Sequence, residues 1–251
     1  MTFLVLVKKE ILGMWRTYRL LVILVVLTVF SMLSPLLAKF MPQLFEMIPG
    51  GEQFSGLIPP PTVMDAVDQY LKNIVQFGIL LALLVSMGSV AQEKDKGTAA
   101  ILLAKPVGRC AFILAKFTAL ALAFLVSMAV AGYCGYFYTQ VLFEPLSPGL
   151  WWQMNGLILL YMLVYVGITL FFSTLSRSQA VAAAGGLGAL MLMGLLGISP
   201  AIKKILPDAL VGAAKGAFLG VSIDWTPLWV TAGLVAVTVA AACLVFRRQE
   251  L

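Results

Sequence analysis

Residues 153–175 read QMNGLILLYMLVYVGITLFFSTL, a stretch of 23 residues without a charged side chain. An α-helix rises about 1.5 Å per residue, so this stretch is long enough to cross a hydrocarbon layer of about 30 Å. Inside lipid the backbone must satisfy its own hydrogen bonds, and a helix does so. The stretch therefore predicts a membrane-spanning helix.

The rest of the chain has the same character. Hydrophobic residues make up 61% of the 251 residues and charged residues 11%, whereas a soluble domain carries about 25% charge. We expect an all-α integral membrane protein with one domain over 1–251. Its six predicted transmembrane helices are 20–38, 73–91, 110–138, 153–175, 179–198 and 227–246.

Two segments near the N-terminus differ from the spans. Residues 1–18 alternate apolar and charged at helical spacing, which predicts an amphipathic helix at the membrane interface; an early start of the first span is the alternative. Residues 39–72 are rich in proline, glycine and acids, and the run at 59–61 forbids a helix there. We therefore expect a long loop before the second span.

Lysines and arginines predict the orientation. With the N-terminus inside, twelve basic residues lie on the cytoplasmic side and five outside, which accounts for all 17. Cytoplasmic loops of membrane proteins carry the excess of lysine and arginine. Both termini are therefore expected in the cytoplasm, and the chain in a bacterial plasma membrane as a multi-pass protein. The net charge of +6 has the same explanation, so we expect no nucleic-acid partner.

Several kinds of chemistry lack the residues they need. The chain has no histidine, which excludes imidazole catalysis and histidine-ligated metal. Cys110, Cys134 and Cys243 form no Cys-x-x-Cys pair and are read as apolar fillers. Met191 and Met193 are read as packing rather than a copper route. We expect no catalytic residue, no metal site and no cofactor in this chain.

The predicted spans contain no acid, and their only charged residue is Lys116, whose ammonium is expected to snorkel outward. Ion-coupled carriers usually hold ionisable residues deep in the bilayer. If the protein moves something, the energy is therefore expected to come from outside the membrane domain.

The segment 92–109 between the second and third spans suits such a role. Gly97 permits a turn, Thr98 can cap a short helix and Pro106 ends it. The helix is partly apolar and flanked by charges of both signs, which suits insertion into a groove of a soluble partner; a solvated loop at the headgroups is the alternative. The candidate residues are Glu93, Lys94, Asp95, Lys96, Gly97, Thr98, Ile101, Leu102, Leu103, Pro106 and Arg109.

The pattern Glu93, Gly97-Thr98, Leu102-Leu103, Pro106 and Arg109, with Lys116 at the start of the next helix, resembles the intracellular signature of type-2 ABC exporter permeases (ABC-2 type). The resemblance also covers the topology of the whole chain. It implies that this chain is the transmembrane permease subunit of an ABC transporter and that 92–109 is the coupling helix for a nucleotide-binding subunit. It also implies that 1–18 is the family's connecting helix.

The chain contains no Gly-x-x-x-x-Gly-Lys-Ser/Thr, so ATP and Mg are expected on a separate ABC ATPase and this chain is not expected to be an enzyme. The resemblance further implies two permease halves in the bilayer, hence a second copy or a homologous permease. An apolar translocation path suits an amphipathic or hydrophobic cargo: peptide, lipid, drug or antibiotic. The alternative is a partner-independent channel or carrier, or a structural membrane protein.

Two sets of small residues are further candidates. Ala184, Gly185, Gly188 and Ala189 give the fifth span a flat surface for helix packing or a dimer interface. In the outer linker 199–226, Gly212, Gly216 and Gly220 recur every four residues and would form one stripe on a helix. The family resemblance implies short re-entrant helices there as an extracellular gate; a surface loop is the alternative.

Overall fold

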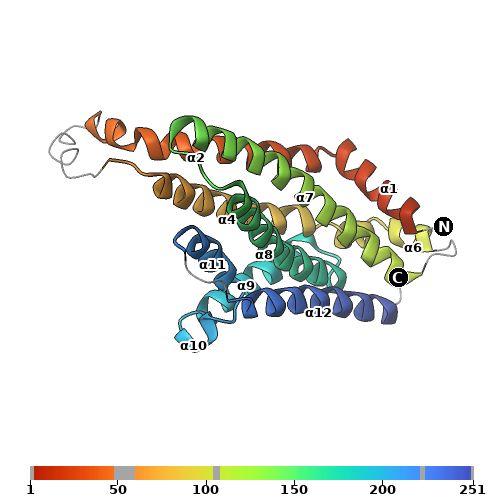
Figure 1. The fold of residues 1–251 in the computed structure, drawn as a ribbon. Helices are drawn as coiled ribbons and strands as arrows, with labels where there is room; N and C mark the ends of the chain where they lie inside the picture. Colours follow the sequence, from red (N-terminus) through yellow and green to blue (C-terminus); the bar gives the residue numbers. More distant parts are fainter. Residues whose placement is uncertain (1–2, 48–59, 104–107, 221–223, 250–251) are drawn as a thin grey trace.

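A computed structural model describes residues 3–47, 60–103, 108–220 and 224–249. These residues form helices and no strand, and six of the helices are long and apolar enough to cross a membrane, which confirms the predicted all-α membrane fold (Figure 1). The helices are α1 (Phe3–Arg16), α2 (Arg19–Glu46), α4 (Val63–Ser86), α5 (Ala91–Asp95), α6 (Thr98–Leu103), α7 (Arg109–Leu142), α8 (Pro148–Leu175), α9 (Gln179–Leu196), α10 (Pro200–Lys203), α11 (Asp208–Phe218) and α12 (Thr226–Arg248).

The loop expected over 39–72 is much shorter than predicted. Helix α2 continues to Glu46 with two prolines inside it, and α4 begins at Val63 rather than near 73. The start of α4 is set by a capping box, in which the Thr62 backbone N donates to Asp65 Oδ2 at 2.7 Å and the Asp65 backbone N donates to Thr62 Oγ1 at 3.4 Å. Pro60 and Pro61 precede this cap and are not helical, as predicted.

The N-terminal helix α1 is separate from the first span. The chain breaks at Thr17 and Tyr18, and Tyr18 has a φ of 59°, the left-handed conformation that ends a helix. Helix α1 packs against α7 and α2 through a buried face that includes Leu6, Val7 and Met14. The early start of the first span is therefore excluded.

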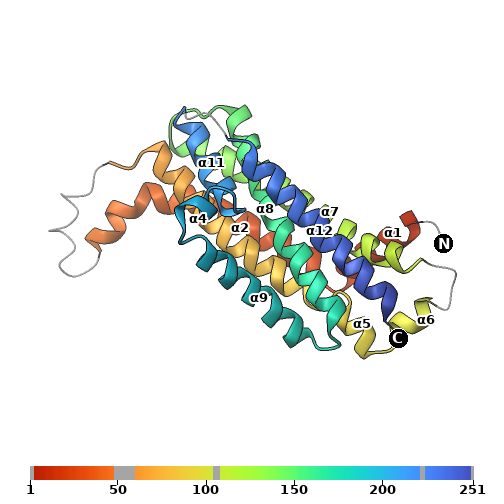
Figure 2. The ribbon, with the colours of Figure 1, turned by 90° about the horizontal axis from the view of Figure 1, so that it is seen from below.

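Helix α8 is the centre of the bundle. It contacts α4, α7, α9, α11 and α12. In the most apolar 18 residues of α8, 67% of the residues are buried, whereas the share is 11% for α9, which lies at the edge of the bundle (Figure 2). Helices α2 and α7 run side by side on the opposite flank. The start of α1 and the end of α12 lie at the end of the bundle that carries α6, which we call the α6 end (Figures 1 and 2).

Buried polar side chains join the central helices. Tyr70 on α4 donates to Asn155 Oδ1 at 2.5 Å, Asn155 donates to the Trp151 carbonyl at 2.9 Å, and Trp151 Nε1 donates to the Gly132 carbonyl at 2.9 Å. The first bond joins α4 to α8 and the third joins α8 to α7, and such interhelical bonds help to hold helices together in a membrane.

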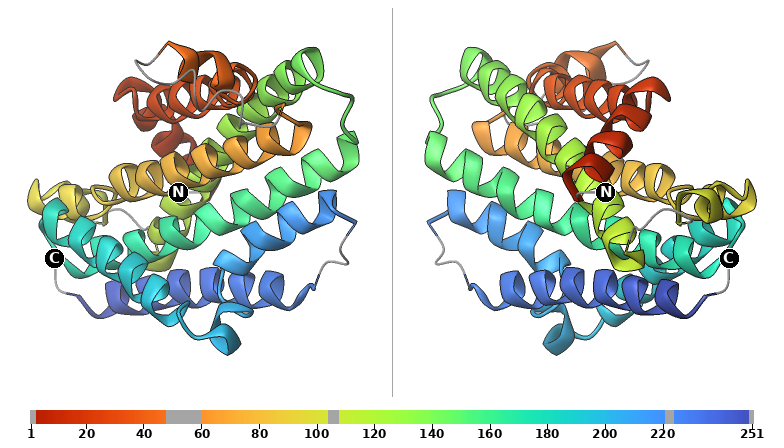
Figure 3. Two further views of the ribbon diagram at one scale, coloured as in Figure 1. Left: turned by 90° about the vertical axis from the view of Figure 1, so that its left-hand side faces the viewer. Right: turned by 90° about the vertical axis from the view of Figure 1, so that its right-hand side faces the viewer.

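The described part of the outer linker forms helices α10 and α11 rather than a surface loop. Helix α11 lies along α8 and is held near both ends (Figure 3). Tyr161 on α8 donates to the Asp208 carboxylate, and Lys215 Nζ lies 2.6 Å from Asp68 Oδ2 on α4. Two polar contacts thus fix this helix to two different spans.

Candidate functional site

The predicted coupling segment forms two short helices, α5 and α6, joined by a turn at Gly97. Gly97 has a φ of 67°, which a residue with a side chain rarely adopts. Thr98 Oγ1 donates to the Glu93 carbonyl at 3.2 Å, so its hydroxyl closes the turn between the helices. The segment therefore folds back on itself at the α6 end of the bundle.

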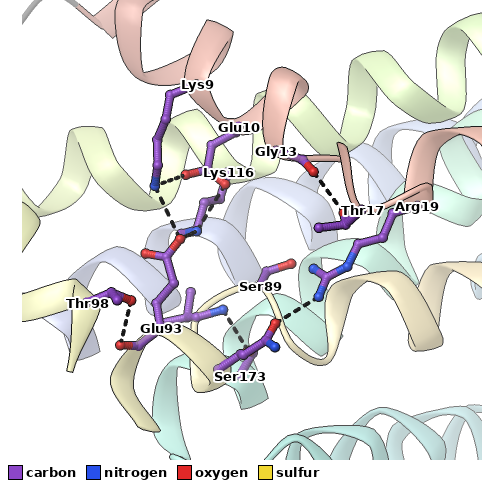
Figure 4. Close-up of polar contacts among 12 residues, drawn as sticks. Lys9, Glu10, Gly13, Thr17, Arg19, Ser89, Glu93, Thr98, Lys116 and Ser173 are labelled. Atoms are coloured by element: carbon purple, nitrogen blue, oxygen red, sulfur yellow. Dashed lines mark hydrogen bonds and ion pairs between the residues drawn. The ribbon is translucent and has the colours of Figure 1, made fainter. Parts of the chain in front are cut away.

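Four charged residues from three helices meet beside this turn (Figure 4). Lys116 Nζ on α7 lies 2.8 Å from Glu93 Oε1 on α5 and 3.1 Å from Glu10 Oε2 on α1. Lys9 Nζ on α1 lies 2.9 Å from Glu10 Oε1 and 3.3 Å from Glu93 Oε1. We call Lys9, Glu10, Glu93 and Lys116 the charge cluster. It ties the coupling segment to the N-terminal helix and to the third span.

The expectation that Lys116 snorkels outward is wrong. Its side chain is 2% exposed and its ammonium contacts both carboxylates of the cluster. Helix α1 covers this position and brings Glu10 to it, so the lysine finds its counter-ions inside the protein instead of at the headgroups.

The charges of the cluster stabilise one another. Burial opposes ionisation of Glu10, but the positive charges of Lys116 and Lys9 outweigh it and lower the pKa of Glu10. Burial also opposes protonation of Lys9, but the carboxylates of Glu10 and Glu93 outweigh it and raise the pKa of Lys9. Both residues are therefore charged at neutral pH.

Two further contacts fix the start of α5. Ser173 Oγ on α8 accepts from the backbone N of Val90 at 3.1 Å and of Ala91 at 3.0 Å, and donates to the Met87 carbonyl at 2.8 Å. Arg19, at the start of α2, donates to Gln92 Oε1 at 2.9 Å. The coupling segment is thus held by α1, α2, α7 and α8.

Among the described side chains of α6, the apolar one that faces outward is that of Ile101. Ile101 is 71% exposed, whereas Leu102 is half-buried and packs against the core. An open groove of about 360 Å³ runs beside α6, lined by Lys9, Glu93, Thr98, Ile101 and Leu102. The side chain of Leu103 and the whole of Pro106 lie outside the described residues, so the structure places neither.

The other charges of the segment that the structure describes divide into two groups by their contacts. Asp95 and Lys96 are exposed, and Asp95 lines a hollow of about 390 Å³ beside the α8–α9 turn. Lys94 and Arg109 instead make hydrogen bonds to backbone and side-chain atoms at the ends of α8 and α12. The sequence did not distinguish these groups.

The small residues of α9 face different ways. A Cβ on Gly185 would lie 2.4 Å from the Phe172 ring, and one on Gly186 would lie 2.6 Å from Leu83 Cδ2, so both pack closely inside the bundle. Ala184 and Gly188 are exposed, and Ala189 is intermediate. Part of the flat surface therefore packs against other helices of this chain, and part of it is exposed.

The predicted glycine stripe of the outer linker is only partly helical. Gly212 and Gly216 lie on α11, but the helix ends at Phe218 and Gly220 lies beyond it with a φ of 73°. Gly220 therefore terminates α11 in the left-handed conformation, and the expectation of a three-glycine stripe on one helix is wrong.

Sequence reasoning missed the partners of the coupling segment. Glu10, Arg19 and Ser173 all contact the segment or the charge cluster, yet none was singled out. A signal for the Glu10–Lys116 pair was available in the sequence. Glu10 is an acid in a mostly basic N-terminal helix, and Lys116 is a lysine inside a span that has no other charge.

Known proteins resemble the chain over its full length. A family model described as "ABC-2 family transporter protein" matches residues 4–251. The chain is also 27% identical over 252 aligned residues to the "Uncharacterized transmembrane protein YxlG" of Bacillus subtilis (strain 168), which covers 98% of this chain and 97% of the relative. Both matches extend from the N-terminal helix through all six spans.

Proposed function

This chain belongs to the ABC-2 family of transporter proteins, and we propose that it is the permease subunit of an ATP-driven exporter whose ATPase is a separate chain. The observation that carries the proposal is the coupling segment. Its helix α6 presents an exposed isoleucine beside an open groove, while α5 is fixed to four other helices.

Such an arrangement suits transmission of force. A surface that only binds a partner needs no internal attachment, whereas one that moves the spans must be fixed to them. The charge cluster attaches the coupling segment to α1 and α7, and Ser173 attaches it to α8. A push on α6 from a soluble subunit would thus reach several membrane helices together.

The energy would come from that subunit, because the chain has no phosphate-binding loop of its own. A second permease copy, or a homologous permease, would complete the membrane part. Its contact surface would include the free face of α9, with Ala184 and Gly188, because α9 is the least buried of the six candidate spans. The cargo class that fits an uncharged path is amphipathic or hydrophobic.

The test is recovery of an ATPase. The tagged chain is purified in mild detergent from its native host, and co-purifying proteins are identified by mass spectrometry. We expect an ABC ATPase at a one-to-one ratio. Ile101→Asp should reduce its recovery at least about tenfold, because burying an isoleucine contributes about 1.5–3 kcal/mol.

Ile202→Asp is the matched control, since it makes the same change at a partly exposed isoleucine on α10. It should leave recovery unchanged. Transport activity of the purified chain without any ATPase would instead support a partner-independent channel or carrier, and would contradict the proposal.

A further inference from the structure

The C-terminal end of α12 meets the coupling segment in a small core of its own. Phe246 on α12 stacks on Phe112 on α7 with ring centroids 5.2 Å apart. Val90, immediately before α5, belongs to the same buried cluster. The end of the last span is therefore packed against the beginning of the third span and the start of the coupling segment.

Arg109 connects these parts by hydrogen bonds. It is the first residue of α7, and its Nη1 donates to the carbonyl oxygens of Arg247 at 2.9 Å and of Gln249 at 2.7 Å. The last carbonyls of a helix have no partner within the helix, and basic side chains commonly satisfy them. Arg109 thus caps α12 from the residue where α7 begins.

Gln249 makes the second connection. Its Oε1 accepts from Lys94 Nζ on α5 at 2.9 Å, and its Nε2 donates to the Thr174 carbonyl on α8 at 2.9 Å. Lys94 Nζ also donates to the same Thr174 carbonyl at 2.8 Å. One glutamine therefore joins the end of the chain to both α5 and α8.

We propose that Arg109, Lys94 and Gln249 form a clamp that couples movement of the coupling segment to α12. They act as positioning residues and not as contacts to the ATPase. The inference rests on the proposed function. Beyond the clamp, α12 packs along α8 and leads back to α11 at the other end of the bundle (Figure 2). The clamp would therefore relay a push on α6 to the helix of the outer linker.

The assignment differs from the one made on sequence alone, where Lys94 and Arg109 orient a soluble partner. Their donors are already engaged within the chain, although Arg109 is exposed, whereas among the described residues of the segment Asp95 and Lys96 are exposed and make no side-chain hydrogen bond. The two assignments predict opposite results for the same variants.

The experiment uses the complete complex with its ATPase and follows backbone hydrogen exchange with and without ATP. In the unaltered complex we expect ATP to change exchange both in 91–103 and in 243–249. In Arg109→Ala and Gln249→Ala, ATPase recovery should be unchanged. Without nucleotide, the rate of backbone hydrogen exchange in 243–249 should rise about tenfold, because one or two hydrogen bonds are lost. Adding ATP should no longer change this rate.

Arg248→Ala is the matched control, because Arg248 is an exposed neighbour whose side chain makes no hydrogen bond among the described residues. It should behave like the unaltered chain. Arg109→Ala changes the first residue of α7 and could prevent insertion of the chain into the membrane. Gln249→Ala leaves α7 unchanged, so in that case its result alone decides the test.

Loss of the ATPase from the variants would overturn the inference, because these residues would then be partner contacts. An ATP response that persists in 243–249 of both variants would also overturn it. A failure of the unaltered chain to recover any ATPase is a different result: it would overturn the proposed function first, and the coupling role with it.

Discussion

A single buried lysine balances two carboxylates at the α6 end of the bundle. Lys116 comes from α7, while its counter-ions come from α1 and α5, so each ion pair joins two helices. Buried charges are costly to separate from their partners, because the remaining charge stays in a poorly solvated place. The cluster therefore specifies one arrangement of three helices.

Replacing this lysine should destabilise the protein. In Lys116→Met the side-chain volume is nearly kept, but Glu10 and Glu93 face each other with only Lys9 between them. We expect a loss of about 3 kcal/mol, the lower end for breaking a buried pair, because both carboxylates are partly exposed. Equilibrium unfolding in mixed micelles would measure the loss.

Lys8→Met is the control, since Lys8 is exposed on α1. Adding Glu93→Gln to Lys116→Met should recover part of the stability, because only one carboxylate then remains beside Lys9. Equal stabilities of the two lysine variants would show that the cluster contributes nothing.

The same residues predict how stability depends on pH. The folded-state pKa of Glu10 is lowered, so its contribution is present above its ordinary value of 4.5 and is lost as the pH falls through the folded value. The folded-state pKa of Lys9 is raised, so its contribution is present below 10.5 and is lost as the pH rises through the folded value.

Unfolding in detergent should therefore show no transition from Glu10 or Lys9 between about pH 5 and 10. Glu10→Gln should reduce the loss of stability in acid, and it should also reduce the loss on the basic side, because Glu10 is one of the two carboxylates that raise the pKa of Lys9. A stability transition near neutral pH that Glu10→Gln removes would contradict this account.

At the scale of elements, two glycines of α9 make a matched pair. A Cβ on Gly186 would lie 2.6 Å from Leu83 Cδ2 and 2.7 Å from Thr169 Oγ1, whereas one on Gly188 would meet nothing within 4 Å. Gly186→Ala should therefore cost about 1–3 kcal/mol by overpacking. Gly188→Ala should be neutral or slightly stabilising, because alanine favours the helix.

Thermal unfolding of the detergent-solubilised protein would measure both variants. If Gly186→Ala were as stable as Gly188→Ala, the close approach of α9 to α4 and α8 would be wrong. Crosslinking through a cysteine at 188 would test separately whether the free face meets a second copy.

The sequence predicted elements better than the contacts between them. Long uncharged stretches located all six spans, because crossing lipid requires both length and apolar composition. The start of α4 was missed because the Thr62–Asp65 capping box lies in a segment whose prolines dominate its composition. The α6 helix was predicted from its own capping and stop signals, but the outward direction of Ile101 depends on packing against other helices.

The candidate site follows the same pattern. Its local residues were identifiable, since turn and apolar signals lie within 92–109. Glu10, Ser173 and Gln249 were not, because their contacts to Lys116, Ala91 and Lys94 span 106, 82 and 155 residues of the chain and no local pattern encodes such contacts.

At the scale of the whole molecule, the distribution of basic residues predicts that both termini face the cytoplasm. In a chain whose three cysteines are replaced, a single cysteine at position 2 or 250 should react with an impermeant maleimide only after the membrane is permeabilised. A cysteine at position 56 should react in intact cells. Labelling of either terminus in intact cells would reverse the topology, and the α6 end could not meet a cytoplasmic subunit.

The lengths of the spans have a consequence for the lipid around them. Helix α9 has 18 residues and rises about 27 Å, whereas α7 has 34 and rises about 51 Å. A hydrocarbon layer is about 30 Å thick. Helix α7 can tilt within it, but α9 must stand nearly upright, and the neighbouring leaflets must become thinner to match it. The exposed lysines Lys203 and Lys204, at the end of the short helix α10 that follows α9, would draw phosphate groups inward there. The protein should therefore deform the bilayer on the α9 side and prefer membranes of short-chain lipids.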